Sequence, residues 1–511
     1  KANFSSTEAY LQNLQARDYV SENQVDNFIM QTRQMVDRYY QEAFTEAIRE
    51  IGCSEDIFEP LDNSFVTLKE EFLESEQAVS MVKRLAASPL VKRIYVENHG
   101  LDESADTEIQ PYGWFGSCEG ETLKTINGTA TSTSPYKGNN VMVGVSEASN
   151  GIANAAFFSE HYANLNFAAL SSGSVTDHAT KVAAIVAAIA PNCTLRSYPL
   201  TAEEDLISLG VNIINCSYRK INSDKTSFNP GQYCYYDARI GDRVKNDYVT
   251  YVIAAGNDGA RVSCPANAAN AITVGATDNN GTTKASYSNY DTLMEMDKPT
   301  VVANGAPHVP FLNDAFHTDF GTSYAAPMVT GAIAAMLSKK PLLKHSQEMQ
   351  IALLMANANL TKMGGNYTLK LSGMSDYFGA GMLDIDNMMA NINNVYGQVV
   401  TSVPSTGIVA EYTINVPSSA VGKMLRSALF TMNSDYANRN TTSFSAPDIP
   451  TYSLISYFNG QQLDTSYAGG SRNCLTGFAP INQAGTYTIR IIRETTAVEE
   501  PERIACIQYT G

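Results

Sequence analysis

The 511-residue sequence predicts an α/β fold, in which a parallel sheet carries helices on both faces and further regions lie before and after it. Three observations support this fold class. From Val141 to about Tyr396, short apolar segments alternate with helical ones, which is typical of a parallel sheet. Residues 7–50 repeat apolar side chains at roughly helical spacing, so a helical region precedes the sheet. After about Gln398, strand-like segments alternate with turns, as in a β-sandwich.

Length and composition indicate a globular chain of about three domains. Hydrophobic residues make up 44% and charged residues 17% of the sequence, which is a globular balance. We divide the chain into an N-terminal helical region (1–60), an α+β unit (61–110), a parallel-sheet domain (111–397) and a C-terminal β-sandwich (398–511).

The expected elements follow in chain order. Residues 7–50 are interpreted as a packed helical pair in preference to a coiled-coil site for a partner. The α+β unit has a strand–helix–strand pattern: Phe65–Leu68, Ser75–Ala87 and Leu90–Val96. In the parallel-sheet domain we expect strands at 141–145, 211–215 and 249–255 and a helix at 179–190. In the sandwich we expect strands at 408–416, 452–458 and 485–492.

Charge and hydropathy exclude two classes of function. The net charge of −17 argues against nucleic-acid binding, because phosphate would be repelled, but it suits basic or neutral protein substrates. No run of about 18 apolar residues occurs, so no membrane span is predicted. The sequence opens at Lys1 without a signal-peptide pattern, and we expect such a segment to be absent or already removed.

The eight cysteines are scattered along the chain, and none forms a close pair with zinc-like spacing. An even number permits disulfides. We expect Cys474 to pair with Cys506, since both lie in the last domain. The low density of cysteines leaves the redox compartment open.

Two segments carry a candidate nucleophile and its base. Ser323 follows a glycine and opens an alanine-rich apolar stretch, so it lies near the positive end of a helix dipole. Taken alone, such a serine is more often a helix cap. His178 begins another alanine-rich helix, and histidine is the usual general base for a serine hydroxyl because its pKa lies near neutrality.

Two further segments end in polar side chains. The apolar strand that begins at Val141 ends in Glu147, at the carboxyl edge of a parallel sheet, where a carboxylate can orient an imidazole. The strand at 249–255 runs into Gly256 and Asn257, whose amide can donate to a tetrahedral oxyanion. An acid at a strand end is usually solvated and an asparagine after glycine usually serves a turn, so only the combination is informative.

Together these segments resemble the subtilase family over about residues 111–397. The acid, histidine and serine follow one another in the chain order of subtilisin. The resemblance rests on the following segments: Tyr136-Lys137-Gly138-Asn139-Asn140-Val141, His178-Ala179-Thr180-Lys181-Val182-Ala183 (His-Gly-Thr-His-Val-Ala in the family), Asn215-Cys216-Ser217, Ile272-Thr273-Val274-Gly275-Ala276, Ala285-Ser286-Tyr287-Ser288, Gly321-Thr322-Ser323-Tyr324-Ala325-Ala326-Pro327 and Tyr377-Phe378-Gly379-Ala380-Gly381-Met382-Leu383.

The sequence departs from the family at a few of these positions. The family usually has aspartate where this chain has Glu147, and Asp177 is a rival acid beside His178. Ala179 and Lys181 replace a glycine and a second histidine without removing a catalytic group. After Ser217 the chain has Tyr218-Arg219-Lys220 where small residues are common; these side chains either reshape the substrate cleft or turn to solvent.

The resemblance implies a serine endopeptidase that hydrolyses protein substrates through an acyl-enzyme. In this interpretation Ser323 attacks, His178 is the base and Glu147 orients it, while Asn257 stabilises the oxyanion. Substrate-binding residues would be Ser217, Tyr218 and Gly256.

The resemblance also implies a zymogen or a protease whose propeptide stays bound. Residues 61–110 look like a subtilase propeptide that is cut between about residues 97 and 127, although a permanent regulatory domain is an alternative. Two other functions compete, a pseudoprotease that binds a partner peptide and a self-processing subtilase with one dedicated partner. No cofactor is required, calcium is allowed as a stabilising ion, and a secreted or cell-surface location is expected.

Overall fold

The computed structural model describes most of the chain. The described residues are 22–52, 54–58, 68–69, 72, 77–87, 101–103, 126–128, 134–148, 150–162, 164–170, 172–220, 230–231, 233–278, 280–292, 296–310, 316–364, 367–432, 451–468, 472–494 and 502–510.

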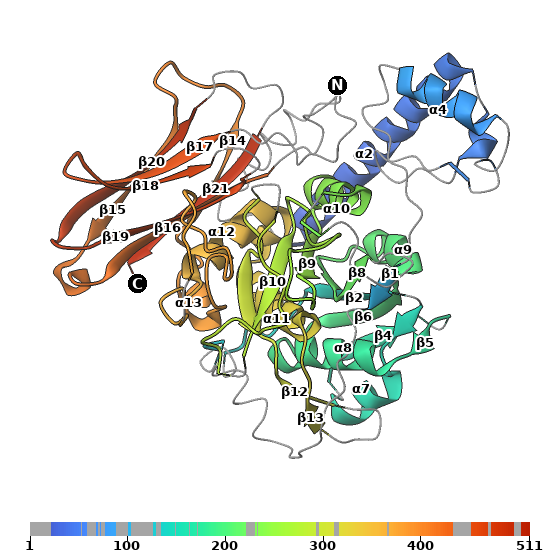
Figure 1. The fold of residues 1–511 in the computed structure, drawn as a ribbon, viewed down its shortest axis with the longest axis horizontal. Coiled ribbons are helices and arrows are strands. Elements are labelled where there is room, and N and C mark those ends of the chain that lie inside the picture. The colour runs from blue at the N-terminus through green and yellow to red at the C-terminus, as the bar shows by residue number, and fades with distance from the viewer. Residues whose placement is uncertain are drawn as a thin grey trace.

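A seven-stranded parallel sheet forms the centre of the molecule (Figure 1), in the order β11-β10-β9-β7-β2-β6-β4. Its strands in chain order are β2 (Met142–Glu147), β4 (Asn166–Ala169), β6 (Thr194–Pro199), β7 (Ile213–Cys216), β9 (Thr250–Ala254), β10 (Ile272–Thr277) and β11 (Val301–Asn304). The four residues of β7 and the five of β9 are all buried, because helices cover both faces of the sheet.

Helices α8 (Asp177–Ile189) and α11 (Thr322–Lys339) pack against each other on one face of the sheet. Thr330 of α11 donates to the side chain of Asn215 in β7, so Asn215 points to this face. Successive strand residues point to opposite faces, and the next residue, Cys216, lies near Glu203 of α9 (Glu203–Ser208). α9 therefore covers the other face, where α10 (Tyr235–Asn246) joins it through an ion pair between Arg243 and Glu204.

The remaining elements of this domain surround the sheet. They are β3 (Gly151–Ile152), α7 (Ala155–His161), β5 (Ser174–Val175), η2 (Leu200–Ala202), β8 (Tyr218–Lys220), β12 (His308–Pro310), β13 (Phe316–Thr318), η3 (Pro341–His345), α12 (Gln347–Asn357) and α13 (Ile385–Ala390).

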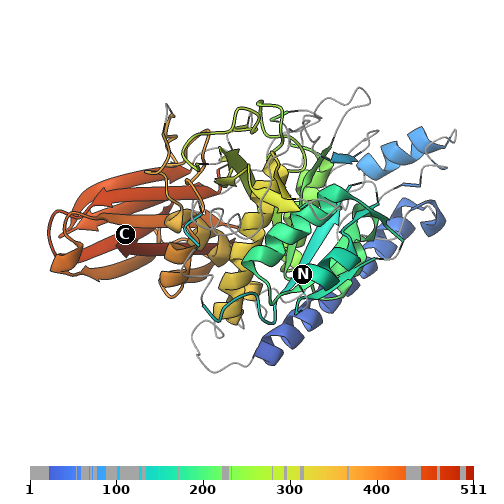
Figure 2. The same ribbon diagram turned by 90° about the horizontal axis from the view of Figure 1, so that it is seen from below.

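The N-terminal part consists of α2 (Glu22–Ile51), η1 (Glu55–Ile57) and α4 (Ala78–Ala87), followed by the short strand β1 (Leu101–Glu103). One end of α2 contacts η3 of the central domain, and α2 runs along the side of the molecule in Figure 2. Near its other end, Ile48, Phe58, Ala78 and Met81 are buried, and the Phe44 and Phe58 rings meet edge to face at 5.5 Å. Within the described residues this region contains one long helix; residues 7–21 of the predicted helical segment lie outside them.

The C-terminal part is formed by two antiparallel sheets of four strands, ordered β14-β21-β16-β19 and β15-β20-β17-β18. The strands are β14 (Val395–Val400), β15 (Ile408–Val416), β16 (Met424–Thr431), β17 (Tyr452–Phe458), β18 (Gln461–Ala468), β19 (Cys474–Pro480), β20 (Gly485–Arg493) and β21 (Glu502–Thr510), with the turn η4 (Ser418–Ala420) between β15 and β16. Leu429 and Ile504 from one sheet share a core with Ile489 and Ile491 from the other, so the sheets pack face to face.

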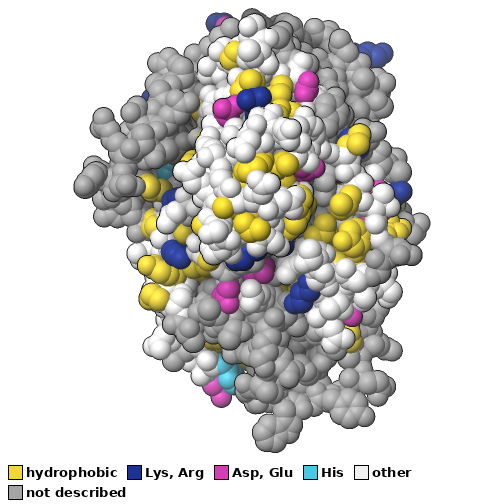
Figure 3. Space-filling view, turned by 90° about the vertical axis from the view of Figure 1, so that its left-hand side faces the viewer, with side chains coloured by type: hydrophobic (Ala, Val, Ile, Leu, Met, Phe, Trp, Pro, Cys, Tyr) yellow, Lys and Arg dark blue, Asp and Glu magenta, His cyan; other side chains and the backbone are white. Residues whose placement is uncertain are grey.

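This sandwich is joined to the central domain through its first sheet. Strands β14, β16 and β21 contact α12, and Phe430 belongs to the main core while its neighbour Leu429 faces the other sheet. Asn473 donates to the carbonyl oxygen of Ala269, and Arg426 donates to that of Ala358. The free end of the sandwich carries hydrophobic side chains interspersed with polar and charged ones of both signs (Figure 3).

The fold prediction is confirmed for the parallel sheet and the antiparallel region that follows it. The expected strands 408–416 and 452–458 match β15 and β17 at both ends, and the strands predicted near 141, 211 and 249 correspond to β2, β7 and β9. Of the α+β unit, the helix is α4, whereas the expected strand 90–96 and most of the strand 65–68 lie outside the described residues. No helix in the described part of the chain is long and apolar enough to cross a membrane.

The expected disulfide between Cys474 and Cys506 is wrong. Cys506 pairs in register with Leu429 and Cys474 pairs with Phe430, so strand β16 separates the two positions. Neighbouring strands lie about 4.8 Å apart, so two ladder spacings exceed the reach of a disulfide. Cys474 is a buried free thiol, and a disulfide joins Cys234 to Cys264 instead.

Candidate active site

The carboxyl end of β2 marks the point at which the order of the strands reverses. The chain adds β6 on one side of β2 and then continues with β7 on the other side. In open parallel sheets, the groups that act on ligands gather at such a switch point. Glu147, the last residue of β2, is fully buried there.

Glu147 meets His178, which begins the helix α8. The distance between Glu147 Oε2 and His178 Nδ1 is 2.7 Å, and both side chains are buried. α8 starts where it does because Thr176 caps it, accepting a hydrogen bond from the backbone N–H of Ala179 at 3.1 Å. A carboxylate on Nδ1 fixes the imidazole so that Nε2 is left to act on a substrate or nucleophile. Asp177, the rival acid, lies half-buried in the first turn of the same helix.

Ser323 lies in the first turn of α11, where the helix dipole makes the surroundings electropositive. Its side chain is almost fully buried, and its Oγ lies 3.5 Å from the carbonyl oxygen of Ser217. Ser217 Oγ donates in return to the carbonyl oxygen of Ser323 at 2.9 Å, and it accepts from Asn215 at 2.9 Å. The predicted substrate residue Ser217 therefore anchors the Ser323 turn with its side chain, while its backbone carbonyl faces the hydroxyl of Ser323.

Asn257 is held with its amide nitrogen toward the Ser323 turn. Its Oδ1 accepts hydrogen bonds from the N–H and the hydroxyl of Thr322 at 2.9 and 2.8 Å. These bonds fix the orientation of the amide, so that Nδ2 faces the space beside Gly321. A Cβ at Gly321 would lie 3.3 Å from Asn257 Nδ2 and 3.6 Å from the backbone nitrogen of Ser323. Two donors thus converge on a space that exists because residue 321 has no side chain, and such a pair suits an oxyanion.

Gly256 is required by the turn that presents Asn257. Its φ is +109°, and an added Cβ would lie 2.4 Å from Asn289 Nδ2. Both the backbone conformation and the close approach exclude a side chain. The N–H of Gly256 donates to Thr322 Oγ1 at 3.1 Å, so this predicted site residue ties the turn to α11.

A short strand of the same chain lies against the segment after Ser217. β1 pairs antiparallel with β8, and the partners are Leu101 with Lys220, Asp102 with Arg219 and Glu103 with Tyr218. Tyr218, the remaining predicted substrate residue, is buried, and burial raises the pKa of its phenol well above its usual value. The backbone edge of β8 is therefore occupied by a strand from the N-terminal part of the chain (Figure 1).

Two ion pairs beside these residues were not predicted. Lys181, one turn after His178, contacts Asp319 at 2.6 Å, and the hydroxyl of Tyr324 also donates to Asp319 at 2.6 Å. Arg219 of β8 pairs with Asp258, the residue after Asn257. The sequence signal was present in both cases, since Lys181 and Arg219 are departures from the family at buried positions, and a buried charge requires a partner.

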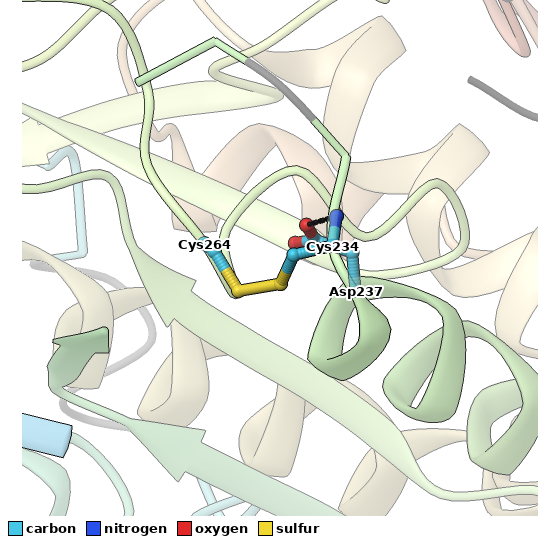
Figure 4. A group of neighbouring side chains, drawn as sticks. All are labelled: Cys234, Asp237 and Cys264. Atoms are coloured by element: carbon cyan, nitrogen blue, oxygen red, sulfur yellow. Dashed lines mark hydrogen bonds between the residues drawn. A yellow bond between two sulfur atoms is a disulfide. The ribbon is translucent and has the colours of Figure 1, made fainter. Parts of the chain in front are cut away.

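One group of side chains in the described residues is close enough to share a metal ion, namely Cys234, Asp237 and Cys264 (Figure 4). The two sulfur atoms are bonded to each other, and Asp237 Oδ2 accepts a hydrogen bond from the N–H of Cys234 at 2.7 Å. Calcium prefers a shell of oxygen ligands, which this group does not provide. The disulfide instead links the start of α10 to the segment that contains Cys264. The carbonyl oxygen of Cys264 accepts a hydrogen bond from the N–H of Lys220 in β8 at 2.8 Å.

Comparison with known proteins identifies the family of the segment that carries this site. Residues 138–381, which include all seven predicted site residues, match the model of the subtilase family, peptidase S8. This segment is a subtilase domain.

The subtilase domain has relatives among characterised proteins. An extracellular serine proteinase of Thermus sp. (strain Rt41A) is 39% identical over 129 residues, which are 25% of this chain and 30% of that protein. Subtilisin-like protease 2 of Pseudogymnoascus destructans is 40% identical over 107 residues, 20% of this chain and 26% of that protein. The matched segments thus span less than a third of each relative. Among solved structures, the prenylagaramide maturation protease PagA aligns with a TM-score of 0.41 and 22% identity, over 53% of this chain and 98% of that one.

Proposed function

We propose that this subtilase is a serine endopeptidase that hydrolyses peptide bonds of proteins through an acyl-enzyme. The observation that carries the proposal is the 2.7 Å contact between His178 Nδ1 and Glu147 Oε2 at the carboxyl end of β2, together with the packing of α8 and α11, the helices that carry His178 and Ser323. The family match over residues 138–381 supports the same activity.

The proposed reaction uses these residues in turn. His178 takes the proton of the Ser323 hydroxyl as Ser323 attacks the peptide carbonyl, while Glu147 holds the imidazole and stabilises its charge. The new oxyanion lies between Asn257 Nδ2 and the N–H of Ser323, in the space kept open at Gly321. His178 then passes the proton to the leaving amine, and water releases the acyl group by the reverse sequence.

The residues before the subtilase domain act, in this proposal, as a propeptide. The antiparallel pairing of β1 with β8 supports it, because an extended substrate is expected to bind by adding a strand to this edge. A chain whose own strand occupies the edge is a zymogen until that strand leaves. The same pairing favours a second candidate, a self-processing subtilase that acts on its own chain or one dedicated partner.

Substrate class and location follow from the same proposal. The partners are peptide or protein substrates and the chain's own propeptide-like segment; nucleic acid and membrane are not expected as partners, given the net charge of −17. We place the protein outside the cell, secreted or at the cell surface, and the name of the extracellular Thermus relative supports this. No cofactor takes part in the reaction, and calcium is proposed only as a stabilising ion.

Intact mass before and after incubation with a fluorophosphonate tests the proposal. One adduct on Ser323, absent in the Ser323→Ala and His178→Ala variants, is expected of an activated serine. Turnover of a mixed peptide library then separates a general endopeptidase from a self-processing enzyme, which would cut only its own chain. If a chain freed of its N-terminal segment gives no adduct and produces no fragments, that result would favour a pseudoprotease.

A further inference from the structure

We propose that the ion pair between Arg219 and Asp258 restricts the residue on the acyl side of the cleaved bond to a small side chain. The inference rests on the proposed peptidase function and names its substrate class: peptides with glycine, alanine or serine immediately before the cut. It depends on the register of β1, the face of β8 that the substrate shares, and the position of the ion pair.

The register of β1 shows how an extended peptide aligns with β8. The antiparallel ladder is regular and has no bulge, since Leu101 pairs with Lys220 and Glu103 pairs with Tyr218. A peptide that continues in this register by one residue has that residue opposite Ser217. The carbonyl oxygen of Ser217 lies 3.5 Å from Ser323 Oγ, so the residue opposite Ser217 is the one whose carbonyl meets the nucleophile.

The side chain of that residue points into the protein. Residues directly opposite each other in an antiparallel pair point to the same face, and residues two apart on one strand share a face. Ser217 points toward α11, because its Oγ donates to the carbonyl oxygen of Ser323 at 2.9 Å. The acyl-side side chain therefore lies on the same face as Ser217, the residue before β8, and Arg219 of β8.

The ion pair crosses this same face. Arg219 donates to Asp258, which follows the oxyanion donor Asn257, so the pair connects β8 to the turn on the far side of the acyl carbonyl. Only 10% of the Arg219 side chain and 34% of the Asp258 side chain are exposed. A large acyl-side residue would have to displace a mostly buried guanidinium from its carboxylate, whereas a small residue would leave the pair intact.

A peptide library that varies only the acyl-side residue tests the proposal on the full chain after incubation has released its N-terminal segment. The wild type should cleave after alanine or serine with a kcat/KM at least about 10-fold higher than after leucine or phenylalanine. Arg219→Gly should raise kcat/KM for the leucine and phenylalanine peptides about 10- to 100-fold. In case Arg219→Gly does not fold, Asp258→Ala serves in its place, because it changes the more exposed partner of the ion pair. It should shift the profile in the same direction.

A matched control and a rescue exclude a merely structural effect. Arg261→Ala removes a neighbouring ion pair with Asp291 and should keep the wild-type profile. Exchanging the two charges, with Arg219→Asp and Asp258→Arg together, should restore the preference for small residues. A wild-type profile that accepts phenylalanine as well as alanine overturns the inference but leaves the peptidase. A chain that has released its N-terminal segment and still shows neither turnover nor an adduct on Ser323 overturns both.

Discussion

Removing the buried cation at position 181 should weaken both the fold and the activation of Ser323. Lys181 and Asp319 have side chains only 3% and 1% exposed, and their 2.6 Å contact joins the helix of His178 to the segment before Ser323. Tyr324 and the N–H of Phe320 also donate to Asp319, at 2.6 and 2.9 Å. The change Lys181→Met keeps most of the side-chain volume and removes the charge together with its hydrogen bond to Asp319.

The size of the effect follows from the burial of the pair. Loss of one partner leaves an uncompensated carboxylate in the interior, which typically costs about 3–5 kcal/mol of unfolding free energy. Adding Asp319→Asn removes that charge while the amide oxygen can still accept from Tyr324, so the double variant should recover about half of the loss or more. Because the pair also sets how α8 meets α11, labelling of Ser323 in Lys181→Met should slow by about 10-fold or more.

Denaturant unfolding measures the free energies, with every variant carrying Ser323→Ala so that the chain cannot digest itself. Fluorophosphonate labelling of the same variants with Ser323 restored measures the activation of the serine. Lys423→Met, which removes an exposed lysine, is the control and should change stability by less than about 0.5 kcal/mol. The reasoning is refuted if Lys181→Met is as stable as this control, or if the double variant is no more stable than Lys181→Met alone.

Three further predictions concern other charged and redox groups. Glu147→Gln should lower kcat by about 10⁴-fold, because the amide no longer stabilises the imidazolium, whereas Glu147→Asp should lose less; peptide hydrolysis measures both. Replacing Cys234 and Cys264 by serine opens a link between residues 30 apart and should cost about 3–4 kcal/mol in denaturant unfolding. Burial raises the pKa of Asp297 from 3.8 to about 6, although Lys370 and Arg472 lie 3.7 Å away. Because the pKa is higher in the folded state, the folded protein becomes less stable as the pH rises from about 4 to 6. From pH 4 to pH 7 the wild type should therefore lose roughly 2–3 kcal/mol more unfolding free energy than Asp297→Asn.

Local patterns were sufficient to predict the elements that carry the site. The strand that ends at Glu147 and the helix that starts near His178 follow from apolar runs with a polar residue at one end, and the structure joins those two residues at 2.7 Å. Their order along the chain was enough to suggest a common edge of the sheet, because parallel strands place their carboxyl ends together.

Partners far apart in the chain were not predictable in the same way. Lys181 and Asp319 are separated by 138 residues and Arg219 and Asp258 by 39, and no periodicity links either pair. The cysteine error has the same cause. Proximity in the sequence suggested Cys474 and Cys506, but the sandwich inserts β16 between their strands, and only the topology shows this.

Three charged departures from the family are paired in this structure, and that bears on whether the site is functional. Glu147 reaches His178, Lys181 has Asp319, and Arg219 has Asp258. A site that has lost its function can accumulate changes without their partners, and an unpaired buried charge would cost several kcal/mol. Here each of these three residues has a partner on a different segment of the chain. This pattern favours a working peptidase with an altered specificity over a scaffold that only binds peptide.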